Sequence, residues 1–463
     1  MRQSDRAILI MGLAKGLAAG AAGLALPALA PGAQASGYQL REQSALTQGA
    51  SQAGAAARGD DPSILSFNPA ASAWMTGTNV TAVGSYIAPR AEIEAGGASR
   101  AAVFGGSAIG GTLGGDSAYD AFVPAFYGSH RLNEGVAFGL AVTSPFGLVT
   151  KYEPDFVGRY QALTSSLRTI NVTPSVAVRP LPNLSVGVGL QFQYASARLS
   201  NAVDFGAVGL AASPAFRALG FAPGNRDGIA SVEGTDWDVG WQVGAQYEPM
   251  PGTRIGAAFR SAVFHRLEGE ARFQNVPAAF ALSPALTTQF GNTAASAKLT
   301  TPESVTIGLS QRIGDRFTLL AGAEWTNWSR FYELRVDFDN GRPSTVSSQR
   351  WRDAYFLNIG GEVRVTDTVT LRSGFAWDQS PTRDGFRTPR IPDADRYWLS
   401  VGATWQATPD LALTAAYTHV FADTARVSLR DNGPGTENFT RGNLDARYDA
   451  SVNIVAVQAR LSF

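Results

Sequence analysis

The end of the chain alternates between apolar and polar residues. The even-numbered positions from 458 to 462 are polar: Gln458, Arg460 and Ser462. The odd-numbered positions are apolar: Val455, Val457, Ala459, Leu461 and Phe463. Successive side chains of a β-strand point to opposite faces, so this segment predicts a strand with one apolar and one polar face. The same period of two holds over residues 184–195, which predicts a protein built from such strands.

Turn motifs divide the rest of the chain into similar alternating segments. Six compact turns lie at residues 131–135, 180–183, 248–252, 312–316, 365–368 and 406–410. Seven longer connections lie at about 89–118, 145–167, 200–232, 272–297, 338–352, 380–395 and 427–448. Six turns and seven loops join fourteen strands. Short turns on one side, long loops on the other and an even strand number are typical of a bacterial outer-membrane β-barrel.

The predicted strands have the length and the aromatic ends of membrane-spanning strands. One strand has an apolar face made of Tyr397, Leu399, Val401, Ala403 and Trp405. Its other face, which would line the lumen, carries Trp398, Ser400, Gly402 and Thr404. Nine residues with an aromatic at each end match a tilted strand that crosses a bilayer between two aromatic girdles. A soluble sandwich or propeller also has alternating strands and is the alternative fold.

Composition supports an exported barrel. Residues 1–35 combine Arg2, Arg6 and Lys15 with an apolar stretch and the small residues 33–35, which predicts a signal peptide. Its removal takes three of 38 Lys and Arg and one of 38 Asp and Glu, which leaves 35 against 37. No later segment has roughly 18 uninterrupted apolar residues, so a lipid-embedded protein would have to be a closed barrel. The chain has no cysteine, and we expect no cofactor, metal or nucleic acid.

The segment between the predicted signal peptide and the barrel does not alternate. Residues 36–77 contain short helical patterns, followed by Asn68-Pro69-Ala70. A fourteen-stranded barrel needs water or a plug in its lumen. We therefore assign residues 36–77 to a plug, or hatch, and residues 78–463 to the barrel; a disordered leader is the alternative for the former.

A proline and a glycine interrupt the third predicted strand at Ser144-Pro145-Phe146-Gly147. Pro145 cannot donate a ladder hydrogen bond, and Gly147 weakens pairing. Unpaired backbone that faces lipid is costly, so a break here must face the lumen, be satisfied by another group or serve as an opening. Alternatively, Pro145 begins the long loop.

Two of the long loops are unusually apolar. The first contains Phe205, Val208, Leu210, Phe216, Leu219 and Phe221. The second contains Val276, Phe280, Leu282, Leu286 and Phe290. Exposed apolar patches favour association, so these residues would pack on each other as a lid, bind an apolar ligand, or do both.

Several motifs, in this order and over nearly the whole mature chain, resemble the FadL/TodX family of outer-membrane transporters for long-chain fatty acids and other hydrophobic compounds. They are Asn68-Pro69-Ala70, residues 144–148, Gly240-Trp241, Asn327-Trp328-Ser329, residues 377–381 and residues 391–400. The resemblance implies a monomeric fourteen-stranded barrel with an internal hatch, a capture groove between the two apolar loops and a gap at the kinked third strand. Its function would be passive, ligand-gated uptake of fatty acids or aromatic hydrocarbons, with lateral release into the membrane.

The resemblance also implies roles for individual residues. Gly147, with Pro145 and Phe146, matches the kink of the family. Asn68, Pro69 and Ala70 match a hatch motif that packs near that kink, and Asp378 matches an acidic residue associated with the same contact. Arg335, and less closely Arg198, match basic residues near a ligand carboxylate. Without a carboxylate in the cargo, these arginines would meet loop acids such as Glu333.

The resemblance places the protein in the outer membrane of a Gram-negative bacterium, in contact with its lipid. The terminal Phe463 is the expected signal for the barrel-assembly machinery. Two other functions stay open, a general porin and an outer-membrane lipid-modifying enzyme. A porin would need an open polar lumen. An enzyme would have only His130, His265 and His419 as histidine bases, and no nucleophile motif accompanies them.

Overall fold

The computed structural model describes residues 37–463; the predicted signal peptide lies outside the described residues. The β-segments are β1 (Thr78–Ser99), β2 (Ala121–Arg131), β3 (Val136–Thr143), β4 (Gly147–Lys151), β5 (Thr164–Leu181), β6 (Leu184–Asp204), β7 (Asp227–Met250), β8 (Thr253–Arg260), β9 (Val263–Gln274), β10 (Thr293–Thr301), β11 (Ser304–Ile313), β12 (Phe317–Thr326), β13 (Glu333–Phe338), β14 (Thr345–Ser348), β15 (Ala354–Arg364), β16 (Val369–Asp378), β17 (Arg396–Gln406), β18 (Leu411–Ala422), β19 (Ala425–Leu429) and β20 (Asn443–Ser462).

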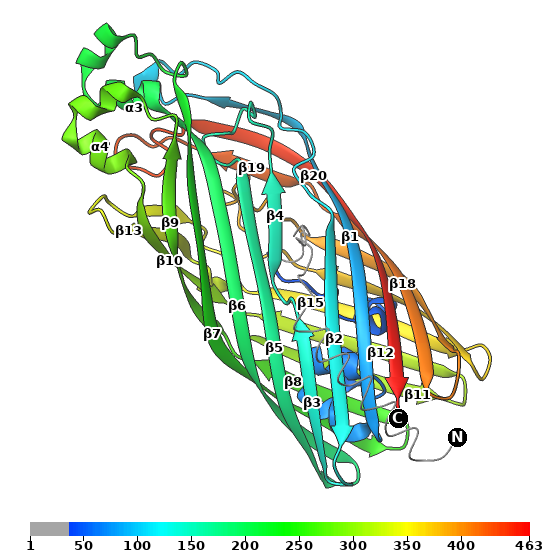
Figure 1. Cartoon of the computed structure of the whole chain (residues 1–463). Helices are drawn as coiled ribbons and strands as arrows, with labels where there is room; N and C mark the ends of the chain where they lie inside the picture. The colour runs from blue at the N-terminus through cyan, green and yellow to red at the C-terminus, as the bar shows by residue number, and fades with distance from the viewer. Residues whose placement is uncertain (1–36) are drawn as a thin grey trace. The chain divides into compact units, whose positions relative to one another are not determined.

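These segments form a closed antiparallel barrel of fourteen strands, which confirms the predicted fold. Six of the fourteen strands are divided into two segments: β3/β4, β8/β9, β10/β11, β12/β13, β14/β15 and β18/β19. The barrel closes where β1 pairs with β20, in a ladder that runs from Asn79↔Ser462 to Ser99↔Asn443. The predicted short turns join the strands on one side, and the predicted long loops join them on the other (Figure 1).

Short helices occupy the hatch and the long loops. In the hatch they are α2 (Ala45–Gln48), η1 (Ala55–Ala57), η2 (Pro62–Ser66) and η3 (Pro69–Trp74). In the loops they are η4 (Ala102–Phe104), α3 (Phe205–Ala212), η5 (Pro214–Leu219), η6 (Ala278–Leu282), α4 (Pro284–Phe290) and η7 (Trp328–Arg330). Among the described residues, none of these helices has the length and hydropathy needed to cross a membrane.

Side-chain exposure alternates along the strands as the sequence predicts. On β17, Trp398 and Ser400 are buried toward the lumen, whereas Leu399 and Val401 are exposed on the outside. The hatch packs against the lumen-facing residues: η3 contacts β5, β6 and β7, and α2 contacts β17 and β18. Figure 1 shows the short blue helices of the hatch inside the barrel, near the end of β20 that carries the C-terminus, with α3 and α4 at the opposite end. The hatch therefore blocks the short-turn half of the lumen.

Candidate functional site

The barrel wall is interrupted between β2 and β4. The ladder between β2 and β3 extends only from Phe126↔Val142 to Arg131↔Ala137. Beyond the kink, β4 pairs with β5 on one side, and the first five residues of β2, 121–125, pair only with β1. The strand resumes at Gly147, so Pro145 interrupts a strand and does not begin the long loop. Two neighbouring strand edges thus face each other without a shared ladder.

The first residues of the hatch satisfy the backbone at this break. Gln39 forms an isolated antiparallel bridge with Phe146. The amide of Leu40 donates to the carbonyl of Pro145 at 2.8 Å, and the amide of Gly147 donates to the carbonyl of Tyr38 at 2.9 Å. The Leu40 side chain is buried in one cluster with Ala121 and Val123 of β2. A side chain on Gly147 would meet it, because an ideal Cβ there lies 2.8 Å from Leu40 Cδ1. Leu40 therefore closes the break from inside.

Tyr38 lies in an aromatic cluster directly beside the break. Its ring makes edge contacts with Trp328, Phe331 and Phe146, with centroid distances of 4.5, 5.6 and 6.0 Å. Trp351 completes the cluster at 5.7 Å. Phe146, which the sequence assigns to the opening, is buried and faces this cluster. The hatch thus fills an apolar space in the lumen with one of its own side chains.

The rest of the hatch is fastened to the barrel by polar contacts. Asn68 Nδ2 donates to the carbonyls of Ala56, Ala245 and Ala257 at 2.8, 3.1 and 3.3 Å, which ties it to β7 and β8. The amide of Ala70 donates to Asn68 Oδ1 at 3.0 Å. Asn68 and Pro69 were expected to pack near the kink. Residues Tyr38–Leu40 of the hatch make that contact instead. The three carbonyls that hold the Asn68 amide group lie elsewhere in the lumen.

Charged groups strengthen this attachment near the short turns. Arg58 forms an ion pair with Glu362 of β15 at 2.7 Å, and Arg372 of β16 binds the same carboxylate at 2.9 Å. Gln458 of β20 donates to Asp61 at 2.9 Å, and its side-chain oxygen accepts from the amide of Ala45 at 3.1 Å. These groups are buried, so breaking their contacts would leave polar atoms unsatisfied.

Asp378 meets the first part of the hatch. Its Oδ1 lies 3.9 Å from the guanidinium of Arg41, which also pairs with Glu324 at 2.6 Å. The Arg41 guanidinium stacks over the ring of Phe356 at 4.1 Å. Next to Arg41, Glu42 is buried, and one oxygen of its carboxylate has no hydrogen-bond partner in the described part of the chain. Burial raises the pKa of Glu42 to about 7, although Arg41 and Arg396 favour its charged form.

The two apolar loops pack on each other at the long-loop end. Five of the residues expected to bind ligand are buried in this cluster: Phe205, Phe216, Phe221, Phe280 and Leu286. Leu210 packs against the cluster and is partly buried. Leu282, also expected to bind ligand, is 76% exposed and points to solvent, because it ends a helix whose other face supplies Phe280. The two apolar loops therefore pack into one apolar cluster at the long-loop end of the barrel.

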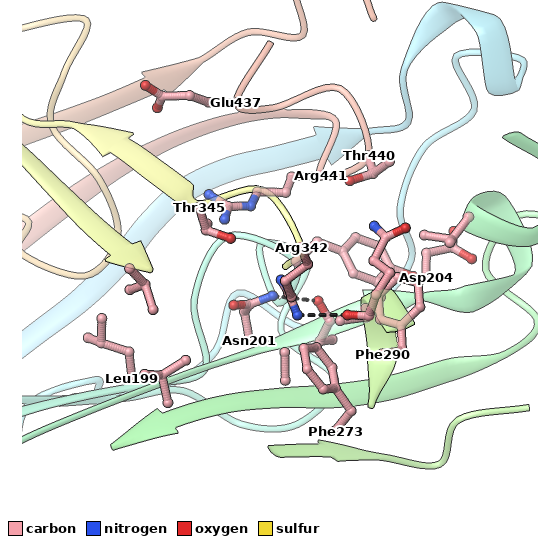
Figure 2. Close-up of a pocket in the computed structure, with 18 of the residues that line it drawn as sticks. Leu199, Asn201, Asp204, Phe273, Phe290, Arg342, Thr345, Glu437, Thr440 and Arg441 are labelled. Carbon is pink, nitrogen blue, oxygen red and sulfur yellow. Dashed lines mark hydrogen bonds between the residues drawn. The ribbon is translucent and has the colours of Figure 1, made fainter. Parts of the chain in front are cut away.

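A cavity of about 470 Å³ adjoins this core. Its apolar lining includes Val208, Phe273, Leu286 and Phe290, and of the ligand-binding residues predicted from the sequence only Leu286 belongs to it. Figure 2 shows Phe273 and Phe290 at one end of the cavity and Arg441 with Thr345 at the other, with Arg342 between them. The size lies in the range of about 300–1,000 Å³ that is common for small-molecule sites.

Three half-buried arginines, Arg342, Arg390 and Arg441, line the same cavity. In residues 37–463, no carboxylate lies within ion-pair distance of any of the three. Arg390 instead donates to the carbonyl of Thr164 at 3.1 Å and to that of Ser200 at 3.2 Å. Burial lowers the pKa of Arg342 to about 10 and that of Arg390 to about 9. An anion beside these groups would offset the effect of this burial on their charged forms.

Arg335 and Arg198, the arginines expected to meet a carboxylate, lie outside the cavity. Both are exposed on the outer face of the barrel, and Arg335 pairs with Glu333 at 2.8 Å. The correction has a simple cause, because strand parity turns Leu334 and Val336 toward the cavity and Arg335 away from it. Arg342, Arg390 and Arg441 lie in irregular loops, where no periodic pattern of the sequence points to them. Among the described residues, no group of acidic and histidine side chains could hold a metal ion.

Fold and site together define a class of protein. A closed barrel of fourteen strands, an internal N-terminal hatch, an apolar cavity at one end and a break in the wall describe an outer-membrane transport protein. Residues 26–463 match the family described as outer membrane protein transport protein (OMPP1/FadL/TodX), and the chain belongs to that family. The family consists of transport proteins for hydrophobic compounds and not of enzymes. The protein therefore lies in the outer membrane of a Gram-negative bacterium.

Several relatives cover most of this chain. A putative outer membrane protein of Neisseria meningitidis serogroup B is 30% identical over 449 residues, or 93% of this chain and 95% of its own. The long-chain fatty acid transport protein of Escherichia coli K12 is 28% identical over 86% of this chain and 90% of its own. The crystal structure of a Pseudomonas aeruginosa FadL homologue has a TM-score of 0.83 and 25% identity, and covers 92% and 100% of the two chains. The Pseudomonas putida toluene transporter TodX, 15% identical with a TM-score of 0.65 over 93% and 99%, shares the fold.

Proposed function

We propose that this protein takes up long-chain fatty acids or similar amphipathic acids by passive diffusion and releases them sideways into the outer membrane. One observation carries the choice of cargo: the cavity joins an apolar lining to three arginines, none of which forms an ion pair with a carboxylate of residues 37–463, although Asp204 and Glu437 also line the cavity. An aromatic hydrocarbon would use the apolar lining alone. A relative named as a long-chain fatty acid transport protein, 28% identical over most of both chains, supports the same choice.

Capture would combine two contributions of different character. A fatty acid gains ~0.8 kcal/mol for each CH2 group that leaves water, and Phe273, Phe290 and Val208 provide the surface that replaces the water. The carboxylate would receive charge-assisted hydrogen bonds from Arg390 and Arg441. Both parts of the cargo are thus matched before it moves deeper into the barrel.

The next site would be the aromatic cluster that Tyr38 now occupies. An incoming alkyl chain competes with the Tyr38 ring for contacts with Trp328, Phe331 and Trp351. Displacing Tyr38 would break the bridge between Gln39 and Phe146 and withdraw Leu40 from the break. The opening is then a shift in population, driven by the better affinity of the cargo for the open state, and needs no energy source.

Lateral release follows from the unequal attachment of the hatch. At the break, residues 38–40 are held by an isolated bridge and by hydrogen bonds from Gln39 to Glu324 at 2.8 Å and from Tyr38 to Thr300 at 3.3 Å. The remainder of the hatch is held by buried contacts that include the ion pair of Arg58 with Glu362. The first part can move while the rest stays in place and blocks the way to the periplasm. The exit with the lowest free-energy cost for an apolar molecule therefore lies between β2 and β4 and leads into the lipid.

Replacing both cavity arginines, Arg390→Gln with Arg441→Gln, should weaken binding of a long-chain fatty acid about tenfold or more. Hydrogen bonds to charged groups contribute about 1.5–3 kcal/mol each, and 1.4 kcal/mol is about tenfold in affinity. Binding of the methyl ester of the same acid should change little. Fluorescence displacement or calorimetry on the purified barrel measures both. Arg335→Gln, an exposed arginine outside the cavity, is the matched control; equal losses for acid and ester would contradict carboxylate recognition.

The hatch should loosen as pH rises. Because burial raises the pKa of Glu42 to about 7, the folded hatch favours protonated Glu42. The stability that protonation contributes is full below about pH 4.5 and is lost as pH rises to about 7. Arg41, Arg396 and Asp378 are the charged groups around it. Hydrogen exchange of residues 38–43, corrected for the intrinsic rate, should increase between pH 5 and pH 8.

The variant Glu42→Gln should make this exchange independent of pH. Glu134→Gln, in an exposed turn, should leave the pH dependence as in the parent protein. A pH dependence that persists in the Glu42 variant would show that another group controls the hatch.

A general porin is the rival function. It requires a continuous polar lumen, whereas residues 37–77 pack against lumen-facing residues of most strands.

We also infer that the barrel acts as a monomer and that the assembly machinery recognises Phe463, whose side chain is 64% exposed. Its backbone pairs with Thr78 at 2.8 and 3.1 Å at the start of β1. The residue thus ends the closing ladder with its side chain free for recognition.

A further inference from the structure

Two arginines lie on the outer face of the barrel beside the break in the wall. Arg168 of β5 pairs in register with Gly147 of β4, so the two residues share the outward face at the edge of the break. Arg198 of β6 pairs with Ser166, two residues from Arg168. Diagonal neighbours of this kind lie about 7–8 Å apart, so both guanidinium groups can reach one ligand. Lys151, at the end of β4, is also exposed on this face.

These arginines lack the partners that other outward arginines have. Arg335 pairs with Glu333 at 2.8 Å, Arg272 with Glu270 at 2.8 Å, and Arg447 with Glu94 at 3.2 Å. In the described part of the chain, no carboxylate forms an ion pair with Arg168 or Arg198. Glu233 lies across from Arg198 in register, but its ion pair is with Arg272. Arg168, Arg198 and Lys151 thus bring three positive charges to this position of the wall, with Glu233 as the carboxylate in register with Arg198.

The height of the two arginines matches lipid headgroups. The rings of Tyr194 of β6 and Trp237 of β7 contact each other in a tilted arrangement with centroids 5.3 Å apart, and they mark the aromatic girdle on the long-loop side. Ile170 pairs with Tyr194, and Arg168 is the next outward residue on its strand. Arg198 lies four residues beyond Tyr194, or ~13 Å along the strand. Both side chains thus lie just beyond the girdle, where headgroups begin.

We propose that Arg168 and Arg198 bind a phosphate group of the phosphorylated glycolipid that forms the outer leaflet of Gram-negative outer membranes. Arginine binds phosphate oxygens through paired N–H groups, and these bonds are stronger than those between neutral groups. A bound headgroup places its acyl chains directly below, beside Gly147 and the edge of β4. This site would hold a lipid at the rim of the break. Binding of that lipid is independent of which cargo the barrel carries.

Native mass spectrometry of the barrel, extracted from membranes in mild detergent, tests the proposal. The parent protein should retain one phosphorylated glycolipid, and Arg168→Gln with Arg198→Gln should retain at least tenfold less. Arg335→Gln, an outward arginine that already has an acidic partner, should retain as much as the parent. Heat-modifiable migration on gels shows that each variant forms a barrel, and Arg168→Lys with Arg198→Lys, which keeps the charge, should restore part of the retention.

A second arm identifies the headgroup. Purified phosphorylated glycolipid added to delipidated barrel should raise its melting temperature, and the enzymatically dephosphorylated lipid should not. Three outcomes would overturn the proposal: equal retention by the double glutamine variant, equal effects of the two lipids, or a bound fatty acid in place of the glycolipid at these arginines. None of these measurements depends on transport.

Discussion

A disulfide between residues 39 and 146 should abolish uptake, and a reducing agent should restore it. Gln39 and Phe146 form an antiparallel bridge flanked by the hydrogen bonds Leu40 to Pro145 and Gly147 to Tyr38. A bridge of this type brings Cα atoms within about 4.5 Å, which suits a disulfide. Since the chain has no cysteine, Gln39→Cys with Phe146→Cys creates the sole possible bond. It would hold Tyr38 and Leu40 in the closed position.

The measurement is uptake of a labelled fatty acid by cells or proteoliposomes under oxidising and reducing conditions. The two single-cysteine variants control for loss of the Phe146 ring. A second pair, Ser51→Cys with Ser400→Cys, controls for tethering itself, because these hydroxyl groups lie 2.7 Å apart between the fixed part of the hatch and β17. We expect this tether to leave uptake intact. If the tether between residues 39 and 146 has no effect on uptake, the hypothesis that the barrel opens at the kink is wrong. If both tethers abolish uptake, the whole hatch must move during transport.

Gly147→Arg should reduce uptake at least tenfold and leave barrel assembly intact. Gly147 faces outward at the edge of β4, and even a Cβ there would lie 2.8 Å from Leu40 Cδ1. A long side chain would occupy the space between β4 and the unpaired edge of β2. The barrel ladder is not affected, since the pairing of β4 with β5 uses backbone groups. Heat-modifiable migration measures assembly, and fatty acid uptake measures transport.

Gly128→Arg is the matched control for this variant. Gly128 also faces outward, has open space where a Cβ would be, and pairs with Leu140 in a continuous part of the ladder between β2 and β3. It lies near the short-turn end, where a lipid-facing arginine costs little. We expect normal uptake from this control. Normal uptake by the Gly147 variant as well would exclude exit between β2 and β4.

The repeated alternation of side chains made the barrel predictable from the sequence. Turn motifs at residues 131–135 or 406–410 separate segments whose parity is regular, and closure follows because open edges cannot persist in lipid. The lumen-facing side of β17 was assigned correctly for the same reason. The sequence also marks Pro145 as a residue that cannot donate to a ladder, but whether it breaks a strand or begins the long loop was decided by the structure, in which β4 resumes at Gly147.

The candidate site was predictable only in part. The sequence identifies apolar loops, yet their phenylalanines satisfy each other in one cluster, and residues beyond them complete the cavity. Arg390 and Arg441 carry no local signal, because each lies in an irregular loop far from Phe273 and Phe290 in sequence. The contact of Tyr38–Leu40 with the kink was likewise missed, since an isolated bridge has no periodicity.

The sequence by itself determined the local properties of this protein: strand number, the alternation of side chains between two faces, and the residue, Pro145, that cannot take part in a ladder. These follow from steric and hydrogen-bonding rules that act between near neighbours in the chain. Tertiary structure alone decided which groups meet across the lumen. Arg335 or Arg390 could each have served a carboxylate on chemistry alone. Strand parity puts Arg335 on the face opposite Leu334 and Val336, but only the closed barrel decides which of the two faces looks onto the cavity and brings Arg390 to it.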